Sequence, residues 1–423
     1  MPGIKTSHLP LNPLPDLLPP TLLEELSLTY QTDKSNQVRL PGTALVLCLL
    51  HALLHHPKLT QRLLEEIYQQ QTGQSTDHST FARRLATINP AYFQALYQHL
   101  YDKLTPDTPR TTLSTLRVRF LDATTVTLSA KLLSFGLLNK TSNPNKTLRH
   151  VKSVLALHPE GFPQFLKLCR DKADKSDCVA LGDTMLEQTQ PNDLWVFDKG
   201  CHDRKRLLAL HQKGSYFLTP QSQQALQCQE PVFEATAPVQ DQAPAKGEAS
   251  YRLTGVCCAT FGNGQETAKE QACWNELPLV VLFGYRFDER KAIWRPLTLL
   301  TNLPLEKASQ RIGPYSYGEV AALYRERWSI EAFFKFLKQY LSLDHFVSRS
   351  ENGIEVMLYM SMIAALLLIW YQRQTQIDRG WRSVKSWLAF DVQAWLQQEL
   401  TSLFARPSPL GGAVPASPLS KRE

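Results

Sequence analysis

The spacing of apolar residues changes character twice along this chain, and the change limits the folds open to it. Residues 21–103 repeat apolar residues at intervals of three and four, which is typical of amphipathic helices. From residue 116 to about 301, runs rich in β-branched residues predict strands with a few helices between them. Helical spacing returns at about residue 316 and continues to about 404. Strands that alternate with helices predict an α/β core, with helical regions before and after it in sequence.

Six segments carry the strand signal: 116–129, 153–158, 165–170, 250–261, 277–287 and 294–302. A seventh strand is expected in NDLWVFDKG, directly after a helix in LGDTMLEQ. Residues 221–250 are rich in Gln, Ala and Pro and are expected to form a loop. The proline-rich residues 9–20 predict an extended lead-in, and the tail after residue 404 is expected to be disordered.

The composition fits a globular chain of two or three domains, with 423 residues, 43% hydrophobic and 20% charged. A net charge of +7 permits a polyanionic partner without requiring one. The eight cysteines include no CxxC pair, so we expect reduced thiols in a cytoplasmic protein. The longest apolar run covers residues 356–370, and a bilayer span needs about 20 residues. A buried helix is therefore expected there.

One charged helical face stands out within YRERWSIEAFFKFLK, residues 324–338. On an ideal helix over 320–341, an arc of roughly 80° holds Tyr324, Arg327, Glu331, Lys335 and Lys338. The opposite side is apolar and is expected to face the core: Leu323, Ile330, Phe333, Phe334, Leu337 and Leu341. An ordinary solvated face explains this pattern through weak i,i+4 pairs. A carboxylate flanked by cations also suits a divalent metal next to phosphate groups, and periodicity leaves both readings open.

Two aspartates could complete such a site. Asp122 follows the apolar run VRFL, and Asp198 follows LWVF, so each side chain could emerge from a sheet edge into a cleft. Aspartates also commonly cap turns after strands, which is the alternative explanation for each. Basic residues are concentrated around both aspartates: residues 117–152 hold seven Lys or Arg against one acid, and residues 199–214 hold five against one. Such clusters suit a phosphate backbone, although basic loops are often merely solvated.

With these residues in view, the chain resembles the insertion-sequence 4 family of DDE transposases. The spacing of Tyr324, Arg327, Glu331 and Lys338 matches the Tyr-Arg-Glu-Lys box of that family. LDATT around Asp122 resembles the segment of the family's first catalytic aspartate. FDKGC around Asp198 resembles that of the second, with Cys201 in place of the usual aromatic residue. The resemblance covers about residues 40–375 and is closest over 316–346.

The resemblance implies an α/β fold with a ribonuclease H-like mixed-sheet core. A β-rich insertion would separate Asp198 from Glu331, with a helical N-terminal region and C-terminal helices around the core. The implied division has six parts: a lead-in at 1–20, a helical DNA-binding region at 21–110, the first part of the core at 115–210, the insertion at 211–310, the second part of the core with the C-terminal helices at 311–404, and a tail at 405–423.

The implied chemistry is cut-and-paste DNA transposition. Asp122, Asp198 and Glu331 would hold two Mg²⁺ ions, with Mn²⁺ as a possible substitute, to cleave the ends of an insertion sequence and join its 3′-hydroxyl to target DNA. Arg327, Lys335 and Lys338 would bind backbone phosphates. Tyr324 would donate to a phosphate or stack near the terminal base.

The implied partners are terminal inverted repeats and target DNA, bound by a homodimer that pairs two ends, with no membrane. Arg83 and Arg84 could belong to a helix-turn-helix that reads the repeats, or could be exposed residues of a helical bundle. The expected location is cytoplasmic and nucleoid-associated. Some members of the family stack a flipped base on a tryptophan of the insertion. That position here is Leu297, and Trp294 lies three residues earlier, which weakens the argument for a hairpin intermediate.

Three alternatives remain at the sequence level. The chain could be a ribonuclease H-like nuclease without strand transfer, although the spacing of the box argues against this. It could be a catalytically inactive DNA-binding relic, although all three acidic residues are present. It could also be a regulator or structural protein whose charged helix is only a surface, which leaves the two aspartates unexplained.

Overall fold

The structure is a computed structural model. It describes residues 14–405 apart from 34–38, 106–115, 129–136, 141–146, 170–175, 202, 222–225, 238–242, 245–250, 263–266, 268–271, 273, 344–345 and 377–379. The chain forms two compact units. Unit 1 contains residues 1–104 and 336–423, and unit 2 contains residues 105–335. The predicted region 311–404 is therefore divided between the two units, and the six-part division of the chain stays a prediction.

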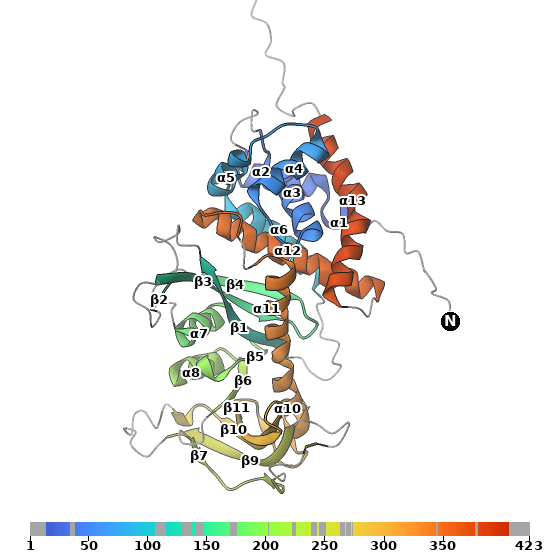
Figure 1. Ribbon diagram of the computed structural model, residues 1–423. Coiled ribbons are helices and arrows are strands. Elements are labelled where there is room, and N and C mark those ends of the chain that lie inside the picture. The colour runs from blue at the N-terminus through green and yellow to red at the C-terminus, as the bar shows by residue number, and fades with distance from the viewer. Residues whose placement is uncertain are drawn as a thin grey trace, which may run out of the picture. The chain divides into compact units, whose positions relative to one another are not determined.

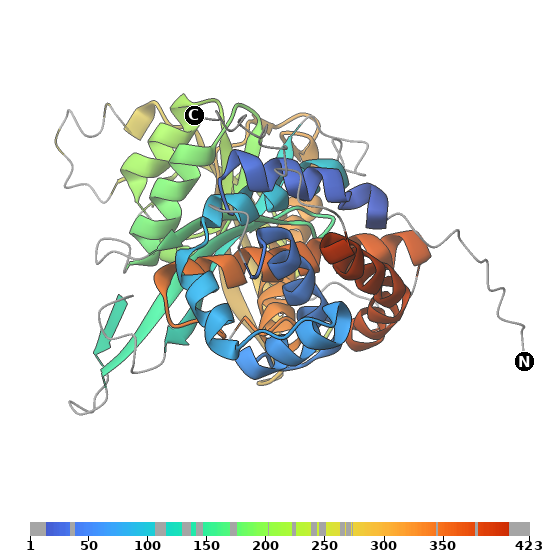
Figure 2. The same cartoon turned by 90° about the horizontal axis from the view of Figure 1, so that it is seen from above.

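Unit 1 is helical over its described residues: α1 (Leu14–Leu17), α2 (Pro20–Thr29), α3 (Gly42–His55), α4 (Gln61–Thr72), α5 (His78–Thr87), α6 (Pro90–Leu104), α12 (Glu351–Thr375) and α13 (Trp381–Ala405). Helix α12 packs against α3, α5 and α6, and α13 packs against α3 and α4. The N-terminal helices, drawn in blue, therefore lie beside the C-terminal helices, drawn in orange and red (Figures 1 and 2). The helices expected from the periodicity of 21–103 are confirmed.

The extended lead-in is wrong for the described part of residues 9–20. Residues 14–17 form α1, and Pro20 begins α2, where its fixed φ angle suits the first helical position. Leu17 and Leu18 are buried, so their apolar side chains anchor this segment to the helical core.

Helix α12 is confirmed as a buried helix. It is long and apolar enough to span a membrane, with a mean hydropathy of 2.0 over its most apolar window. Of that window, 89% is buried inside the fold. The same composition is expected of the central helix of a globular bundle.

Unit 2 begins with a mixed sheet. Its strands are β1 (Arg117–Leu128), β2 (Leu137–Lys140), β3 (Thr147–Leu157), β4 (Pro163–Cys169), β5 (Asp193–Val196) and β6 (Tyr216–Pro220). Strand β3 pairs antiparallel with β1, and both β2 and β4 pair antiparallel with β3. On its other side β1 pairs parallel with β5, which pairs parallel with β6. The antiparallel strands β4, β3 and β1, followed across the sheet by the parallel strands β5 and β6, form a mixed sheet of the expected ribonuclease H-like kind.

Helices connect the parallel strands, as parallel pairing requires. Helix α7 (Asp177–Gln188) precedes β5, and α8 (Arg204–Gln212) joins β5 to β6. The two helices pack against each other, α7 along β1, β3 and β4 and α8 along β6 (Figure 1). A short 3₁₀ turn, Lys199–Cys201, lies between β5 and α8.

The expected β-rich segment extends the same sheet. Strands β9 (Tyr251–Phe261), β10 (Leu279–Asp288) and β11 (Ile293–Thr301) are antiparallel, and β11 pairs with β6. The core also crosses this junction, because Trp195 and Phe217 share one buried cluster with Val281 and Leu300. The loop expected over 221–250 is wrong in part, since it contains the short strands β7 (Leu226–Cys228) and β8 (Phe233–Glu234), which pair with β9.

A small sheet leads back to helices. It consists of β12 (Leu305–Glu306), β13 (Arg311–Ile312) and β14 (Tyr315–Ser316). Helices α10 (Tyr317–Glu326) and α11 (Trp328–Tyr340) follow. Ser316 and Glu319 start α10 with a reciprocal capping box, which satisfies two backbone amides at its N-terminus.

Candidate active site

Strands β1 and β5 bring Asp122 and Asp198 to the same end of the sheet. The last parallel pair between these strands joins Phe120 to Val196. Each aspartate lies two residues beyond its member of that pair. Because parallel strands run in step, the two carboxylates emerge side by side. Strand β1 continues to Leu128 against β3, so Asp122 lies inside the strand, as the expected strand over 116–129 implied.

The charged stretch 320–341 forms two helices, and the expected single helix is wrong. Arg327 lies between α10 and α11. Its backbone amide donates to the carbonyl of Tyr324 at 3.2 Å, and the amide of Ile330 donates to the carbonyl of Arg327 at 3.1 Å. These i,i+3 bonds mark a tightened turn at the junction. The apolar side was predicted correctly, because all six of its residues are buried: Leu323, Ile330, Phe333, Phe334, Leu337 and Leu341.

Arg327 lies at the centre of the site and is 3% exposed. Its Nη2 donates to Oε1 of Glu331 at 2.9 Å, and its Nη1 lies 3.7 Å from Oδ2 of Asp122. Its guanidinium carbon lies 5.7 Å from the ring centroid of Tyr324 and 5.8 Å from that of Trp328. A buried cation needs such partners, because desolvation would otherwise be costly. Arg327 therefore neutralises acidic residues of the site.

The environment of Asp122 links the three acidic residues. Burial raises the pKa of Asp122 to about 6, while the Ala123 amide and the Arg327 charge pull it down. The charges of Glu331 and Asp198 push the pKa of Asp122 up. Charges that act on Asp122 in this way lie close enough to repel its carboxylate, so the site concentrates negative charge near Arg327.

The donor set suits a divalent metal in its chemistry. All three acidic residues offer hard carboxylate oxygens, which Mg²⁺ prefers, and a divalent ion would relieve their repulsion. Within the described part of the chain, no group of three or more His, Cys, Asp or Glu side chains is arranged to hold a metal ion. Glu331 and Asp122 point their oxygens at Arg327 instead. Metal ligation would therefore require these carboxylates to exchange Arg327 for the ion.

The remaining members of the charged face differ in accessibility. Tyr324 is 6% exposed, and burial raises the pKa of its hydroxyl to about 12. Lys335 is exposed, and Lys338 is partly exposed beyond the end of unit 2. The two lysines are thus accessible to a phosphate backbone, whereas Tyr324 and Arg327 are enclosed.

The two arginines of α5 in unit 1 also differ. Arg83 is exposed. The Arg84 side chain is only 12% exposed, donates to the carbonyl of Thr32 at 2.9 Å and forms an ion pair with Asp33. Arg84 therefore holds the α2–α3 connection, and its contact with DNA stays a prediction.

Several basic residues near the aspartates are also engaged within the protein. Arg117 and Arg119 lie 2.9 and 3.4 Å from the buried carboxylate of Asp193, at the amino end of β1 and thus away from Asp122. Arg206 binds Asp183 and Asp203. These ion pairs weaken the argument from charge counts, because these arginines already have acidic partners. The predicted basic side chains that lie outside the described ones are Lys131, Lys140, Lys146 and Arg149.

Two residues of the site were missed from sequence. Trp328 is 49% exposed although it is large and apolar, and the guanidinium carbon of Arg286 lies 5.9 Å from its ring centroid. Trp328 directly follows Arg327, and its place on the polar side of the box could have signalled it. Arg286 comes from β10 of the insertion, and no local pattern could have connected it to the box.

Trp294, by contrast, belongs to the core. It is 3% exposed, its ring lies edge-on to Phe287 at 5.4 Å, and the guanidinium carbon of Arg252 lies 5.3 Å from its centroid. A ring buried in this way cannot receive a flipped base without local unfolding. The structure therefore further weakens the argument from the sequence that a flipped base could stack on Trp294.

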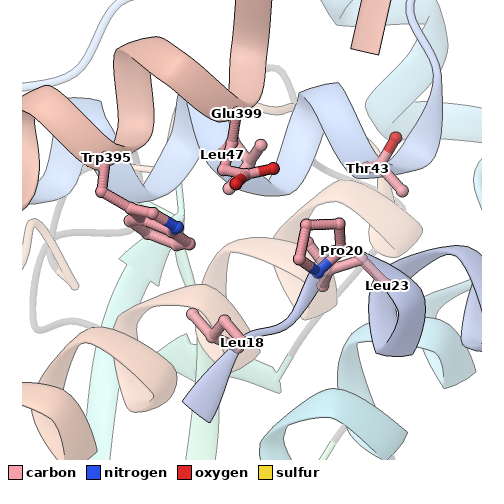
Figure 3. Close-up of a pocket in the computed structure, with 7 residues that line it drawn as sticks. All are labelled: Leu18, Pro20, Leu23, Thr43, Leu47, Trp395 and Glu399. Carbon is pink, nitrogen blue, oxygen red and sulfur yellow. The ribbon is translucent and has the colours of Figure 1, made fainter. Parts of the chain in front are cut away.

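A small apolar pocket lies in unit 1. Its lining comes from Leu18, Pro20, Leu23, Thr43, Leu47, Trp395 and Glu399, as Figure 3 shows. Among the described residues that line it, Glu399 is the one ionisable side chain, so they offer no group of residues for acid–base or metal chemistry.

Comparison with known proteins gives a family match over most of unit 2 and beyond. A family model described as "Transposase DDE domain" matches residues 113–367. A putative transposase for insertion sequence element IS4SA from Synechocystis sp. is 41% identical over 70 residues, which cover 16% of this chain and 20% of that protein. A probable transposase for insertion sequence element IS5377 from Geobacillus stearothermophilus is 37% identical over 57 residues, covering 14% and 15%.

Two further similarities were found. The putative transposase y4zB from Sinorhizobium fredii is 41% identical over 83 residues, 20% of this chain and 21% of that protein. The chain thus matches about a fifth or less of the length of these relatives. A cryo-EM structure of a piggyBac transposase synaptic complex with hairpin DNA aligns at a TM-score of 0.43 and 9% identity, over 93% of this chain and 83% of that one.

Proposed function

The chain belongs to the transposase DDE domain family, and from this premise we propose that it is a DNA transposase that cuts the ends of its own element and joins them to target DNA. The observation that carries the proposal is that the buried Arg327 pairs with both Asp122 and Glu331, while the register of β1 and β5 sets Asp198 beside Asp122. Carboxylates that only face solvent have no need of a shared buried cation. The spacing of Tyr324, Arg327, Glu331 and Lys338 further supports a relationship to the insertion-sequence 4 family.

Each acidic residue has a proposed role. Asp122, Asp198 and Glu331 would hold Mg²⁺, with Mn²⁺ as a substitute, and the bound metal would activate the attacking oxygen and stabilise the leaving one. Asp122 has to be deprotonated to act as a ligand, and the positive charge of Arg327 favours that state. Both aspartates hold one carboxylate oxygen in place, since Oδ1 of Asp122 accepts from the Ala123 amide at 2.8 Å and Oδ1 of Asp198 accepts from the Lys199 amide at 2.7 Å.

The basic residues would bind DNA. Lys335 and Lys338 are accessible and would hold backbone phosphates. Arg327 would exchange its carboxylate partners for a phosphate as the metal enters. Trp328 exposes an aromatic face beside the carboxylates, on which a base could stack. We further propose that two copies of the chain pair two transposon ends, and that the protein works in the cytoplasm on the nucleoid.

The test is cleavage of a labelled duplex that carries the terminal sequence of the element, with Mg²⁺, by wild-type protein and by Glu331→Gln. We expect wild-type nicking at the terminus and a loss of at least about 100-fold in the variant, because a metal ligand is removed. Glu326→Gln is the matched control, since Glu326 is exposed and lies at the end of α10. Equal cleavage by wild type and Glu331→Gln would remove Glu331 from the chemistry.

The same reaction separates the alternatives. Addition of a supercoiled target plasmid should give joined products if the chain transfers strands. Cleavage without joined products would favour a nuclease of the same fold. End-specific binding without cleavage by the wild type would favour an inactive DNA-binding relic.

A further inference from the structure

The insertion supplies an exposed cation next to the candidate active site. Arg286 lies on β10, and its guanidinium carbon is 5.9 Å from the ring centroid of Trp328, the first residue of α11. The charge of Arg286 also stabilises the ionised form of the Tyr324 hydroxyl, which places it within electrostatic reach of the box. A residue from the middle of the insertion thus reaches the residues that surround Arg327.

Arg286 has no acidic partner among the described residues, and this distinguishes it from Arg327 and Arg295. Arg327 is held by Glu331 and Asp122. Arg295, which faces Arg286 across the β10–β11 pair, lies 2.9 Å from Asp288. Two like charges directly opposite each other weaken a sheet. Stability alone does not account for Arg286, whereas an external anion would.

The surroundings of Arg286 indicate which kind of anion it would bind. The site is rich in carboxylates, so an anion that approaches it needs cations at its edge to offset the repulsion. The face of Trp328 holds the guanidinium of Arg286 in place through a cation–π contact, which lowers the entropy lost on binding. Arginine presents several N–H donors in a planar fork that matches the oxygens of a phosphate.

We propose that Arg286 binds a phosphodiester of the element-end DNA next to the scissile position, so that the insertion contributes directly to DNA positioning. This inference rests on the proposed function. Arg286 is a positioning residue, because it would contact the substrate backbone and not the reacting atoms. The insertion would then both extend the sheet and contact the DNA backbone.

The test compares the salt dependence of binding to the terminal DNA duplex, measured with EDTA between 50 and 200 mM salt, for the full-length wild type, Arg286→Ala and Arg286→Lys. Loss of one phosphate contact should reduce the slope of log affinity against log salt by about 0.9. The deficit of Arg286→Ala relative to wild type should therefore shrink about threefold across this salt range. Arg286→Lys should keep the wild-type slope, because it keeps the charge.

Arg290→Ala is the matched control, since Arg290 is exposed in the turn that joins β10 to β11. Its slope should equal that of the wild type. An unchanged slope in Arg286→Ala, or an equal decrease in Arg290→Ala, would overturn the assignment. Thermal unfolding of each variant shows whether a change in binding reflects misfolding.

Should the wild type itself fail to bind its end DNA, the proposed function fails. Should the wild type bind and cut while Arg286→Ala keeps its slope, the phosphate contact alone fails.

Discussion

Arg327 donates to Glu331 at 2.9 Å while its other terminal nitrogen lies 3.7 Å from Asp122, so a single guanidinium engages two acidic residues of the site at once. The arginine is 3% exposed, and its charge stands where a divalent ion would otherwise offset the carboxylates. Under the proposed function, metal and arginine would compete for the same oxygens. DNA would favour the metal, because a phosphate offers Arg327 another anionic partner.

Replacement of Arg327 by glutamine should strengthen metal binding in the absence of DNA. The change removes a buried positive charge within 4 Å of two carboxylates, and a charge at that distance contributes about 4 kcal/mol at an effective dielectric constant of 20. We therefore expect Mn²⁺ to bind Arg327→Gln at least about tenfold more tightly than wild type in calorimetry or Mn²⁺ spin-resonance titrations. Arg325→Gln, an exposed neighbour on α10, should bind like wild type. Equal affinities in all three proteins would contradict the competition.

The difference in stability between Asp122→Asn and the wild type should depend on pH. The folded-state pKa of Asp122 is about 6 and its ordinary value is 3.8, so between these values the folded state binds more protons than the unfolded state. The destabilising contribution of Asp122 is therefore fully present above pH 6 and disappears as the pH falls towards 4. Asp122→Asn should be more stable than wild type by on the order of 1 kcal/mol at pH 7.5, and equally stable near pH 4. Denaturant unfolding at both pH values measures this. A stability difference that grows as the pH falls would contradict the sign.

Substitution of Trp294 should affect the stability of the fold, whereas substitution of Trp328 should affect DNA binding. Trp294 is buried against Phe287, so Trp294→Ala should lower the free energy of unfolding by about 3–5 kcal/mol. Trp328 is 49% exposed, and Trp328→Ala should change that free energy by less than about 0.5 kcal/mol. If a base stacks on Trp328, the same variant should lose about 1–3 kcal/mol of binding to the terminal duplex. Unfolding curves and fluorescence anisotropy give both numbers, and the opposite order of effects would refute the assignment.

In α5, substitution of Arg84 should reduce stability, whereas substitution of Arg83 should leave stability unchanged. Arg84→Ala breaks the ion pair with Asp33, a carboxylate that is 26% exposed in the wild type, so we expect a loss of about 2–4 kcal/mol of stability. Arg83 is exposed, and Arg83→Ala should leave stability within about 0.5 kcal/mol. If unit 1 binds the inverted repeat through α5, Arg83→Ala should reduce the salt slope of binding by about 0.9. Wild-type binding by Arg83→Ala would remove α5 from the DNA interface.

The sequence by itself determined the local elements and the residues of the charged face. The helices of 21–103, the strands β9–β11 and the buried side of the box follow from spacing, because the period of apolar residues reflects which side of an element meets the core. The types of the three acidic residues and their places after apolar runs were likewise visible in the chain.

Tertiary structure decided which residues meet. Strand register placed Asp122 and Asp198 side by side, and the fold brought Arg327, in the turn between α10 and α11, to Asp122 on β1. The same packing buried Trp294 and brought Arg286 to Trp328. Spacing along the chain reports the environment of each element on average. The partner of a charged or aromatic side chain depends on residues far away in sequence, which only the folded sheet and helices bring within a few ångströms.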